Sequence, residues 1–303
     1  MKNPRLSEVS VDLGLSRINI PVFTHKNESS PFSVLITAGV DGDEYASIDA
    51  AYALIEKFSD NPPKINLTII PVVNILGFEL KVSHNPLDGK LPKFIFPGRI
   101  SGSATDRLMA WVSDFVYSSG LWLDLHGGAL DEHLNPFIAV PFPKNAFLRK
   151  LTDGIINTLD GKMLIYDKDN KWTYHDLNKK NILRVVIESG YGGLRKDPMR
   201  NFHLDIVEKI LKVYTRDSSK PSKLKSEKTH FSKIIEIGTK NSGLWYPRLS
   251  DLNTIKKNQF IGKVVSQKNI LLEEIKSPAE GKILWYKTGL HCKRGDTLLG
   301  IAV

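Results

Sequence analysis

The feature that most constrains the fold is a regular alternation of apolar runs and helical patterns along residues 1–215. Strand-like apolar runs, several rich in β-branched residues, occur at 18–25, 32–39, 66–74, 121–128, 136–140 and 183–189. Segments with helical periodicity lie among and after them, at 47–60, 104–120, 145–161 and 201–214. Because strands that alternate with helices at this spacing build layered sheets with parallel neighbours, we expect an α/β fold with a largely parallel sheet.

The pattern changes after residue 215. Residues 216–230 are polar and charged with few apolar side chains, which is typical of a linker. Residues 231–303 contain short strand-like runs punctuated by Gly and Pro, such as IIEIG, FIGKVV and AEGKILWYK. Such runs predict a small all-β barrel or sandwich. We therefore expect a first domain over 1–215, a linker over 216–230 and a β module over 231–303.

Composition narrows the class of protein and its partners. No stretch of the 303 residues approaches the roughly 20 apolar residues of a membrane helix, and the N-terminus lacks the apolar core of a signal peptide. With one cysteine, Cys292, no intrachain disulfide can form, and we expect a cytoplasmic protein with no membrane partner. The net charge of +9 suits an anionic substrate or a solubilising surface. No nucleic-acid-binding signature accompanies it, so we expect no nucleic-acid partner. An unpaired edge of the β module leaves open whether copies associate into a homo-oligomer.

Three acidic residues follow the second apolar run. The stretch LITAGVDGDEYAS places Asp41, Asp43 and Glu44 where a strand passes into a helix. A helix N-terminus favours one carboxylate as a cap, and a solvated acidic turn is an equally simple interpretation. Three carboxylates are more than a cap requires, so the stretch also indicates a site for a positively charged ligand.

Two further strand ends carry polar residues that suit the same site. His126 ends the run LWLDLHGG, and Glu188 ends LRVVIES. Ligands in α/β sheets bind at the carboxyl ends of the strands, so these residues are expected near Asp41 and Glu44. A zinc site needs three nitrogen or oxygen ligands and one open position, which Asp41, Glu44 and His126 can supply.

Two further polar residues, Asp124 and Glu188, are expected to support this metal site. Asp124, two residues before His126, would lie on the same strand face and orient the imidazole, and Glu188 would be the general base for metal-activated water. Structural roles remain alternatives: Asp124 could cap local backbone, and Glu188 could pair with Arg184 or Arg195.

Five segments and the tail together resemble one known family. They are TAGVDGDEY, NPLDGKLPKFIFPG (85–98), GSATDRLMA, DLHGGALDEHLNPF (124–137) and IESGYGG, with SGLWYP, SPAEGKILW and KRGDTLLGIA in the β module. In this order they resemble the succinylglutamate desuccinylase/aspartoacylase family of zinc deacylases, which is related in fold to zinc carboxypeptidases.

The resemblance implies a fold and a reaction. The fold would be an α/β/α sandwich with a mixed, largely parallel sheet and the β module near the mouth of the site. Glu44 and His126 would be zinc ligands and Glu188 the catalytic base of a zinc-dependent amidohydrolase. The reaction would be hydrolysis of a linear, non-peptide amide between a small acyl group and an amine or amino acid.

The chain departs from the family pattern at two places. Asp41 stands where the family has a histidine ligand, and Lys93-Phe94 stands where it has Asn-Arg. Asp41 can bind zinc through oxygen, although two carboxylates make a harder site in which manganese or magnesium are alternatives. Lys93 keeps a positive charge for substrate but lacks the guanidinium fork, and Phe94 would form an apolar wall of the pocket.

Two more residues complete the expected substrate pocket. Arg99, just after the FPG turn, is expected to reach in from its loop. Tyr191, beside the expected base, either donates to an oxyanion or packs.

Two hypotheses follow. The first is an active metal-dependent deacylase acting on a small acylated amine or amino acid. The second is a decayed deacylase scaffold that serves as a binding or regulatory protein. Retention of Glu44, His126 and Glu188 favours the first, and replacement at Asp41 and Lys93 favours the second. Convergence of the three ligand groups would support the enzyme, whereas ligand groups locked against a lysine or arginine would support the decayed scaffold.

Overall fold

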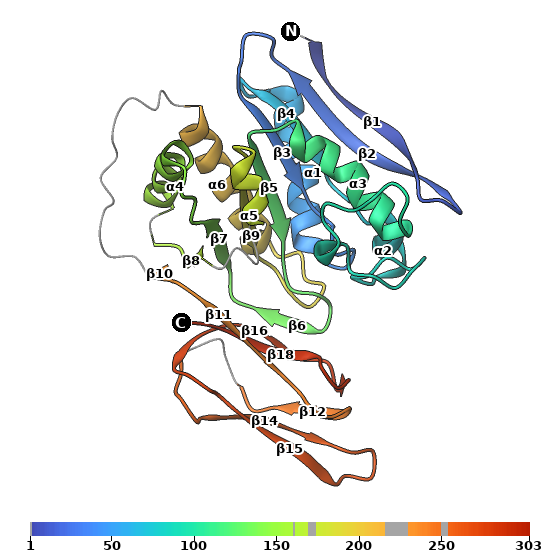
Figure 1. Cartoon of the computed structure of the whole chain (residues 1–303), viewed down its shortest axis with the longest axis vertical. Coiled ribbons are helices and arrows are strands. Elements are labelled where there is room, and N and C mark those ends of the chain that lie inside the picture. The colour runs from blue at the N-terminus through green and yellow to red at the C-terminus, as the bar shows by residue number, and fades with distance from the viewer. Residues whose placement is uncertain (1, 160, 169–173, 216–229, 250–253) are drawn as a thin grey trace.

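The computed structural model describes residues 2–159, 161–168, 174–215, 230–249 and 254–303. All but the last residue of the expected linker, 216–230, lies outside the described residues. Figure 1 shows a helix-covered sheet with two smaller β layers beneath it. In the described part of the chain, no helix has both the length and the apolar character needed to cross a bilayer.

The main sheet is mixed and largely parallel, as expected. It has nine strands in the order β1-β2-β4-β3-β5-β9-β7-β8-β10. The strands β4, β3, β5 and β9 run parallel to one another, as do β7, β8 and β10, whereas β7 is antiparallel to β9. Their bounds are β1 Lys2–Asp12, β2 Arg17–Lys26, β3 Ser33–Thr37, β4 Asn66–Ile70, β5 Leu121–His126, β7 Phe137–Pro141, β8 Leu164–Asp167, β9 Leu183–Glu188 and β10 His230–Phe231.

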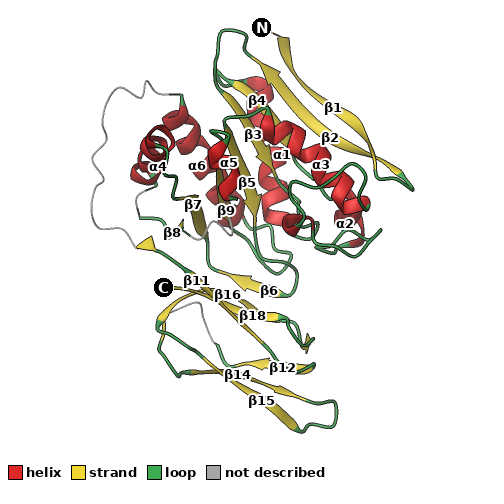
Figure 2. Ribbon diagram, viewed as in Figure 1, coloured by secondary structure: helices red, strands yellow, loops and turns green. Residues whose placement is uncertain are grey.

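Helices cover both faces of this sheet (Figure 2). Helices α1 (Tyr45–Asp60), α4 (Ala146–Thr158) and α6 (Asp197–Tyr214) contribute to one apolar core, and α3 (Ala104–Tyr117) contributes to the other. Short helices α2 (Ile75–Leu80), α5 (His175–Lys179) and the 3₁₀ helix η1 (Pro92–Phe94) lie in the connections. Side chains alternate along β3 accordingly, because Val34 and Ile36 join the first core and Leu35 joins the second. The expected α/β/α sandwich is therefore confirmed.

The β module consists of two antiparallel sheets that enclose a common core. One sheet contains β11 (Ile234–Gly238), β18 (Thr297–Ala302), β16 (Gly281–Lys287) and β13 (Thr254–Ile255). The other contains β15 (Leu271–Lys276), β14 (Phe260–Val265), β12 (Gly243–Pro247) and β17 (His291–Cys292). Trp245 and Leu299 pack in the core between them.

Two strand pairings join the module to the α/β domain. Strand β6 (Glu132–Leu134), which follows β5, pairs with β16 so that His133 lies opposite Tyr286. At the other end, β10 extends the main sheet, because Phe231 pairs with Ile165 of β8. The expected module boundary at residue 231 therefore falls inside a strand of the main sheet. The sequence also gave no expectation of β1, which pairs with β2 along most of its length.

Candidate metal centre

The acidic turn after β3 is buried. Asp41, Asp43 and Glu44 are 1%, 5% and 5% exposed, so the interpretation as a solvated turn is wrong. Glu44 is the N-cap residue of α1, yet its side chain makes no capping hydrogen bond. Asp43 accepts a hydrogen bond of 2.7 Å from the Ser83 hydroxyl. Glu44 therefore does not cap the helix through its side chain, and the Asp43 carboxylate is held by a residue outside the turn.

Glu44 turns toward the end of β5. Its Oε2 atom accepts a hydrogen bond of 3.0 Å from the backbone N–H of Gly127 and lies 3.0 Å from His126 Nδ1. The approach requires glycine at position 127, because a Cβ there would lie 2.4 Å from the carbonyl oxygen of Ser189. The glycine turn after β5 thus places the helix entrance and the imidazole side by side.

Asp41, Glu44 and His126 offer ligand atoms that all lie within 4.8 Å of one another. His126 Nδ1 is 3.0 Å from Glu44 Oε2 and 3.9 Å from Asp41 Oδ2. A tetrahedral zinc ion with bonds of about 2.0–2.1 Å separates its ligand atoms by about 3.3 Å. In addition, Asp41 Oδ1 is buried without a hydrogen-bond partner. One nitrogen and two carboxylates at this spacing fit a divalent metal ion.

Asp124 contacts the other side of the imidazole. Its Oδ2 atom lies 3.2 Å from His126 Nε2 and accepts a hydrogen bond of 3.2 Å from Arg184 Nε. The Thr37 hydroxyl donates to Oδ1 of the same carboxylate. Burial opposes ionisation of Asp124, but His126 and Arg184 outweigh it and hold its pKa well below its ordinary value. Asp124 is therefore a fixed carboxylate that orients the His126 ring.

The same carboxylates change the titration of His126. Burial alone would lower the pKa of the imidazole, but Asp124 and Glu44 outweigh burial and raise it well above its ordinary value. Each ring nitrogen lies within 3.2 Å of a carboxylate oxygen. The contacts and the neighbouring charges therefore favour the protonated form of the imidazole.

Lys93, which the sequence places as a substrate contact, pairs with Asp41. Its Nζ atom lies 2.6 Å from Asp41 Oδ2. Burial disfavours the ammonium, but the charges of Asp41, Glu44 and Glu132 outweigh it and raise the pKa of Lys93. The ligand groups thus converge, as the enzyme hypothesis requires, while one of them is engaged by a lysine, as the alternative hypothesis describes.

Glu188 lies beside this cluster on the neighbouring strand. It is paired in register with His126 across β5 and β9, so the two side chains emerge on the same face of the sheet. Burial is the main cause that raises the pKa of Glu188 to about 7, and Glu132 and Asp41 add to it against the opposing charges of His126 and Lys93. Such a carboxyl group can exchange a proton near neutral pH.

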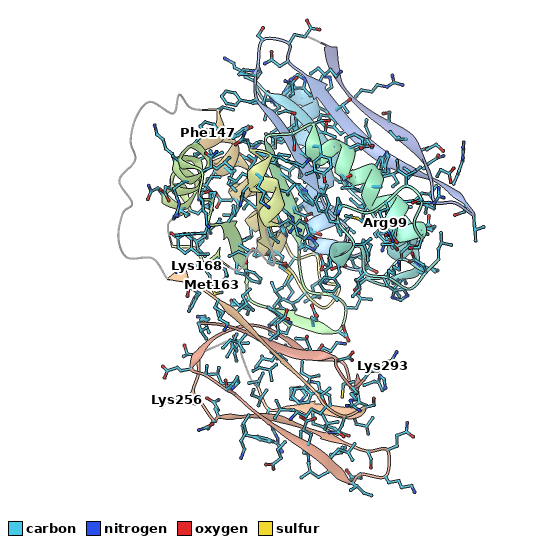
Figure 3. All side chains as sticks on the ribbon, in the orientation of Figure 1. Arg99, Phe147, Met163, Lys168, Lys256 and Lys293 are labelled. Carbon is cyan, nitrogen blue, oxygen red and sulfur yellow. The ribbon has the colours of Figure 1, made fainter. Side chains whose placement is uncertain are left out.

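The other expected site residues lie elsewhere. Arg99, beside α3 in Figure 3, has a side chain that is 77% exposed and lies 3.6 Å from Asp106 Oδ1. A hydrogen bond from Arg99 N to Asp106 O ties its backbone to α3, so its contact with substrate stays a prediction. Phe94 is 75% exposed, and its role as an apolar wall of the pocket also stays a prediction. The Tyr191 ring packs on His133 at 4.2 Å between centroids, which agrees with the packing alternative.

The structure adds residues that sequence reasoning missed. Arg184 binds Asp124 rather than Glu188, and its guanidinium lies against the rings of Trp122 and Tyr174 at 4.5 and 4.3 Å. The available signal was an arginine inside the otherwise apolar run LRVVIES. Glu132, on β6, also belongs to the surroundings of the cluster, because its charge acts on both Lys93 and Glu188.

Comparisons with known proteins identify the family of the chain. A sequence model described as the Succinylglutamate desuccinylase/Aspartoacylase catalytic domain matches residues 32–212. The chain is 30% identical over 123 residues to an N-alpha-acetyl-L-2,4-diaminobutyric acid deacetylase of Halomonas elongata. That match covers 40% of this chain and only 36% of the length of the relative.

Solved structures show the same fold over nearly the whole chain. A succinylglutamate desuccinylase/aspartoacylase from Rhodobacter sphaeroides superposes with a TM-score of 0.80 at 17% identity, covering 99% of this chain and 95% of the other. The product-bound ectoine utilization protein EutE (DoeB) from Ruegeria pomeroyi gives 0.81 at 17% identity, covering 99% and 94%. At this identity the likeness carries the fold, and the site rests on its own residues.

Proposed function

Because the chain belongs to the succinylglutamate desuccinylase/aspartoacylase family of deacylases, we propose that it is a metal-dependent amidohydrolase. Its substrate is a small molecule in which an acyl group is joined by an amide to an amine or amino acid. The convergence of Asp41, Glu44 and His126 within 4.8 Å, with Glu188 in register beside His126, is the observation that carries this proposal.

In this proposal, Asp41, Glu44 and His126 hold one divalent ion. When bound, the ion polarises the amide carbonyl and makes water more acidic. Zinc suits the nitrogen ligand, whereas the two carboxylates leave manganese or magnesium as alternatives. Asp124 and Arg184 keep the His126 ring oriented, so that its Nδ1 atom faces Glu44 and Asp41.

Glu188 carries the proton transfers. With a pKa raised to about 7, its carboxylate accepts a proton from the attacking water and can return it to the amine that leaves. Glu188 is only 5% exposed, and this burial disfavours the charged carboxylate and so maintains its raised pKa. The residue therefore serves as both general base and general acid.

The substrate is proposed from the relative and from the pocket residues. The Halomonas elongata relative is named as a deacetylase of an N-acetylated diamino acid, which makes such compounds the first to test. No guanidinium takes the place of the family arginine, because Phe94 occupies its position and the Arg99 side chain lies 3.6 Å from Asp106 of α3. A substrate carboxylate at that position is therefore not required.

One observation favours a second function. Lys93 occupies an oxygen of Asp41, so the buried charges of the cluster are compensated without a metal ion. This arrangement fits a binding protein built on a deacylase scaffold that performs no turnover.

Hydrolysis of a panel of N-acetyl, N-succinyl and N-formyl amines and amino acids separates the two functions. The protein is stripped with chelator and then supplied with zinc, manganese or magnesium in turn, and the released amine is measured. We expect release that depends on metal and is lost in Glu188→Gln. Release that persists in Glu188→Gln would remove Glu188 from the mechanism, and ligand binding without release by the metal-loaded protein would favour the binding protein.

A further inference from the structure

Lys93 reaches a buried carboxylate from the surface. Its side chain is 36% exposed along its length, whereas the Asp41 side chain that its ammonium contacts is 1% exposed. Lys93 belongs to the short helix η1, and its backbone carbonyl accepts a hydrogen bond from the Tyr174 hydroxyl. The Lys93 backbone is thus held in place, whereas its ammonium is carried on a flexible four-carbon stem.

The ammonium contacts an atom that a metal ion would use. It binds Asp41 Oδ2, which is 3.9 Å from His126 Nδ1 and is therefore placed as a ligand atom. The other oxygen, Oδ1, has no hydrogen-bond partner. A divalent ion held by either oxygen would lie within a few ångströms of the Lys93 ammonium. At about 4 Å in a partly buried setting the repulsion between such charges is strong.

Building on the metal site of the proposed function, we propose that Lys93 is an internal counterion that a divalent metal must displace from Asp41. Lys93 therefore sets the metal affinity of the site. Without metal it neutralises a carboxylate that is buried beside Glu44, and with metal it withdraws along its exposed stem. The two departures from the family pattern, Asp41 and Lys93, are then one functional pair.

The charges around Lys93 support a reversible exchange. Glu44 and Glu132 also act on the Lys93 ammonium, so the site holds more negative charge than Lys93 alone neutralises. Removal of the ammonium without metal would leave Asp41 as an unpaired buried charge, which destabilises a fold. In a variant that lacks the ammonium, an added metal ion would neutralise Asp41 without first having to displace a positively charged side chain.

Metal titration of matched variants tests the exchange. Zinc and manganese are titrated into the chelator-stripped, untagged full chain by calorimetry, comparing wild type with Lys93→Met and Lys93→Gln. The matched control is Lys90→Met, which removes the same charge from the same loop but from a lysine whose Nζ is 2.9 Å from Asp106. We expect both Lys93 variants to bind metal at least about tenfold more tightly, and the control to bind as wild type does.

Melting temperature gives a readout that a purely structural role would not produce. Lys93→Met should melt below wild type after chelation and should gain more from added metal than wild type gains. If the methionine variant does not fold, the glutamine variant carries the test, because its amide can still donate to Asp41.

The outcomes separate this proposal from the one it rests on. Equal or weaker metal binding by the Lys93 variants would overturn the exchange and leave the metal-dependent hydrolase standing. Tighter metal binding by the Lys93 variants than by wild type, without hydrolysis of any acylated amine, would overturn the hydrolase and leave the exchange standing. Absence of metal binding in every variant would overturn both.

Discussion

His126 and Glu188 are register partners on the adjacent parallel strands β5 and β9. The register continues inward, because Trp122 lies opposite Arg184, and Thr37 of β3 lies opposite Asp124. Polar side chains therefore form a row on one face of the sheet that ends at its carboxyl edge. The strand register alone brings a metal-ligand candidate next to a base candidate.

Glu188→Gln should separate catalysis from metal binding. The amide keeps the shape of the side chain but cannot accept the proton, so we expect kcat to fall by about 10²–10⁴. Metal affinity should stay within about twofold of wild type. Steady-state kinetics and metal titration measure the two effects, and Glu56→Gln on the exposed face of α1 is the control. A variant that loses metal as well as activity would show that Glu188 is a ligand instead of the base.

Metal binding should release a proton and strengthen as the pH rises. Asp124 and Glu44 outweigh burial and raise the pKa of His126, so the metal-free cluster carries a proton that a metal ion must displace. Lowering the pH restores that proton and weakens binding. Calorimetry in buffers of different ionisation enthalpy measures the number released. A binding enthalpy that is independent of the buffer would contradict this protonation state.

Arg184→Met should destabilise the fold through Asp124. The guanidinium is the buried counterion of Asp124, and removing one partner of a buried ion pair costs about 3–5 kcal/mol. Arg184→Lys keeps the charge but loses the fork and should cost less. Urea unfolding measures both changes. Equal stability of Arg184→Met and wild type would show that Asp124 does not depend on this pair.

His203 should make the fold sensitive to mild acid. Burial is the main cause that lowers its pKa to about 4, while its Nε2 atom lies 3.2 Å from the carbonyl oxygen of Ser189. The unfolded chain takes up this proton near pH 6.5, so the unfolded state binds more protons between pH 6.5 and 4. Stability should therefore fall by about 3 kcal/mol as the pH drops through that window. Denaturant midpoints from pH 7 to 4.5 should fall less in His203→Gln, and equal slopes would exclude His203 as the cause.

The elements of the α/β domain were predictable because their burial pattern is local. The run at 66–74 contains β4, and the helical pattern at 47–60 corresponds to α1 with small differences at the ends. Strand β1 was not predicted, because its alternation of apolar and polar residues is weak. Its pairing with β2 stabilises it as a strand. The pairing of β10 with β8 joins residues 230 and 164, a contact that no local pattern reports.

Some residues of the candidate site were predictable from local sequence patterns, and others were not. Asp41, Glu44, His126 and Glu188 were predictable because all follow apolar runs whose ends meet at one edge of the sheet. The pair of Lys93 and Asp41 was not predictable. Lys93 lies 52 residues after Asp41 on a short helix within a loop, and the geometry of that loop decides where its side chain points. The position of Arg99 likewise depends on loop geometry, since a hydrogen-bonded turn ties its backbone to Asp106.

The central claim is that Asp41, Glu44 and His126 together hold one divalent ion. Its most direct test is the metal content of untagged protein after dialysis against zinc or manganese, with wild type and His126→Ala compared side by side. We predict close to one ion per chain in wild type and almost none in the variant. Wild type that retains no ion, or a variant that keeps the same ion, would contradict the claim.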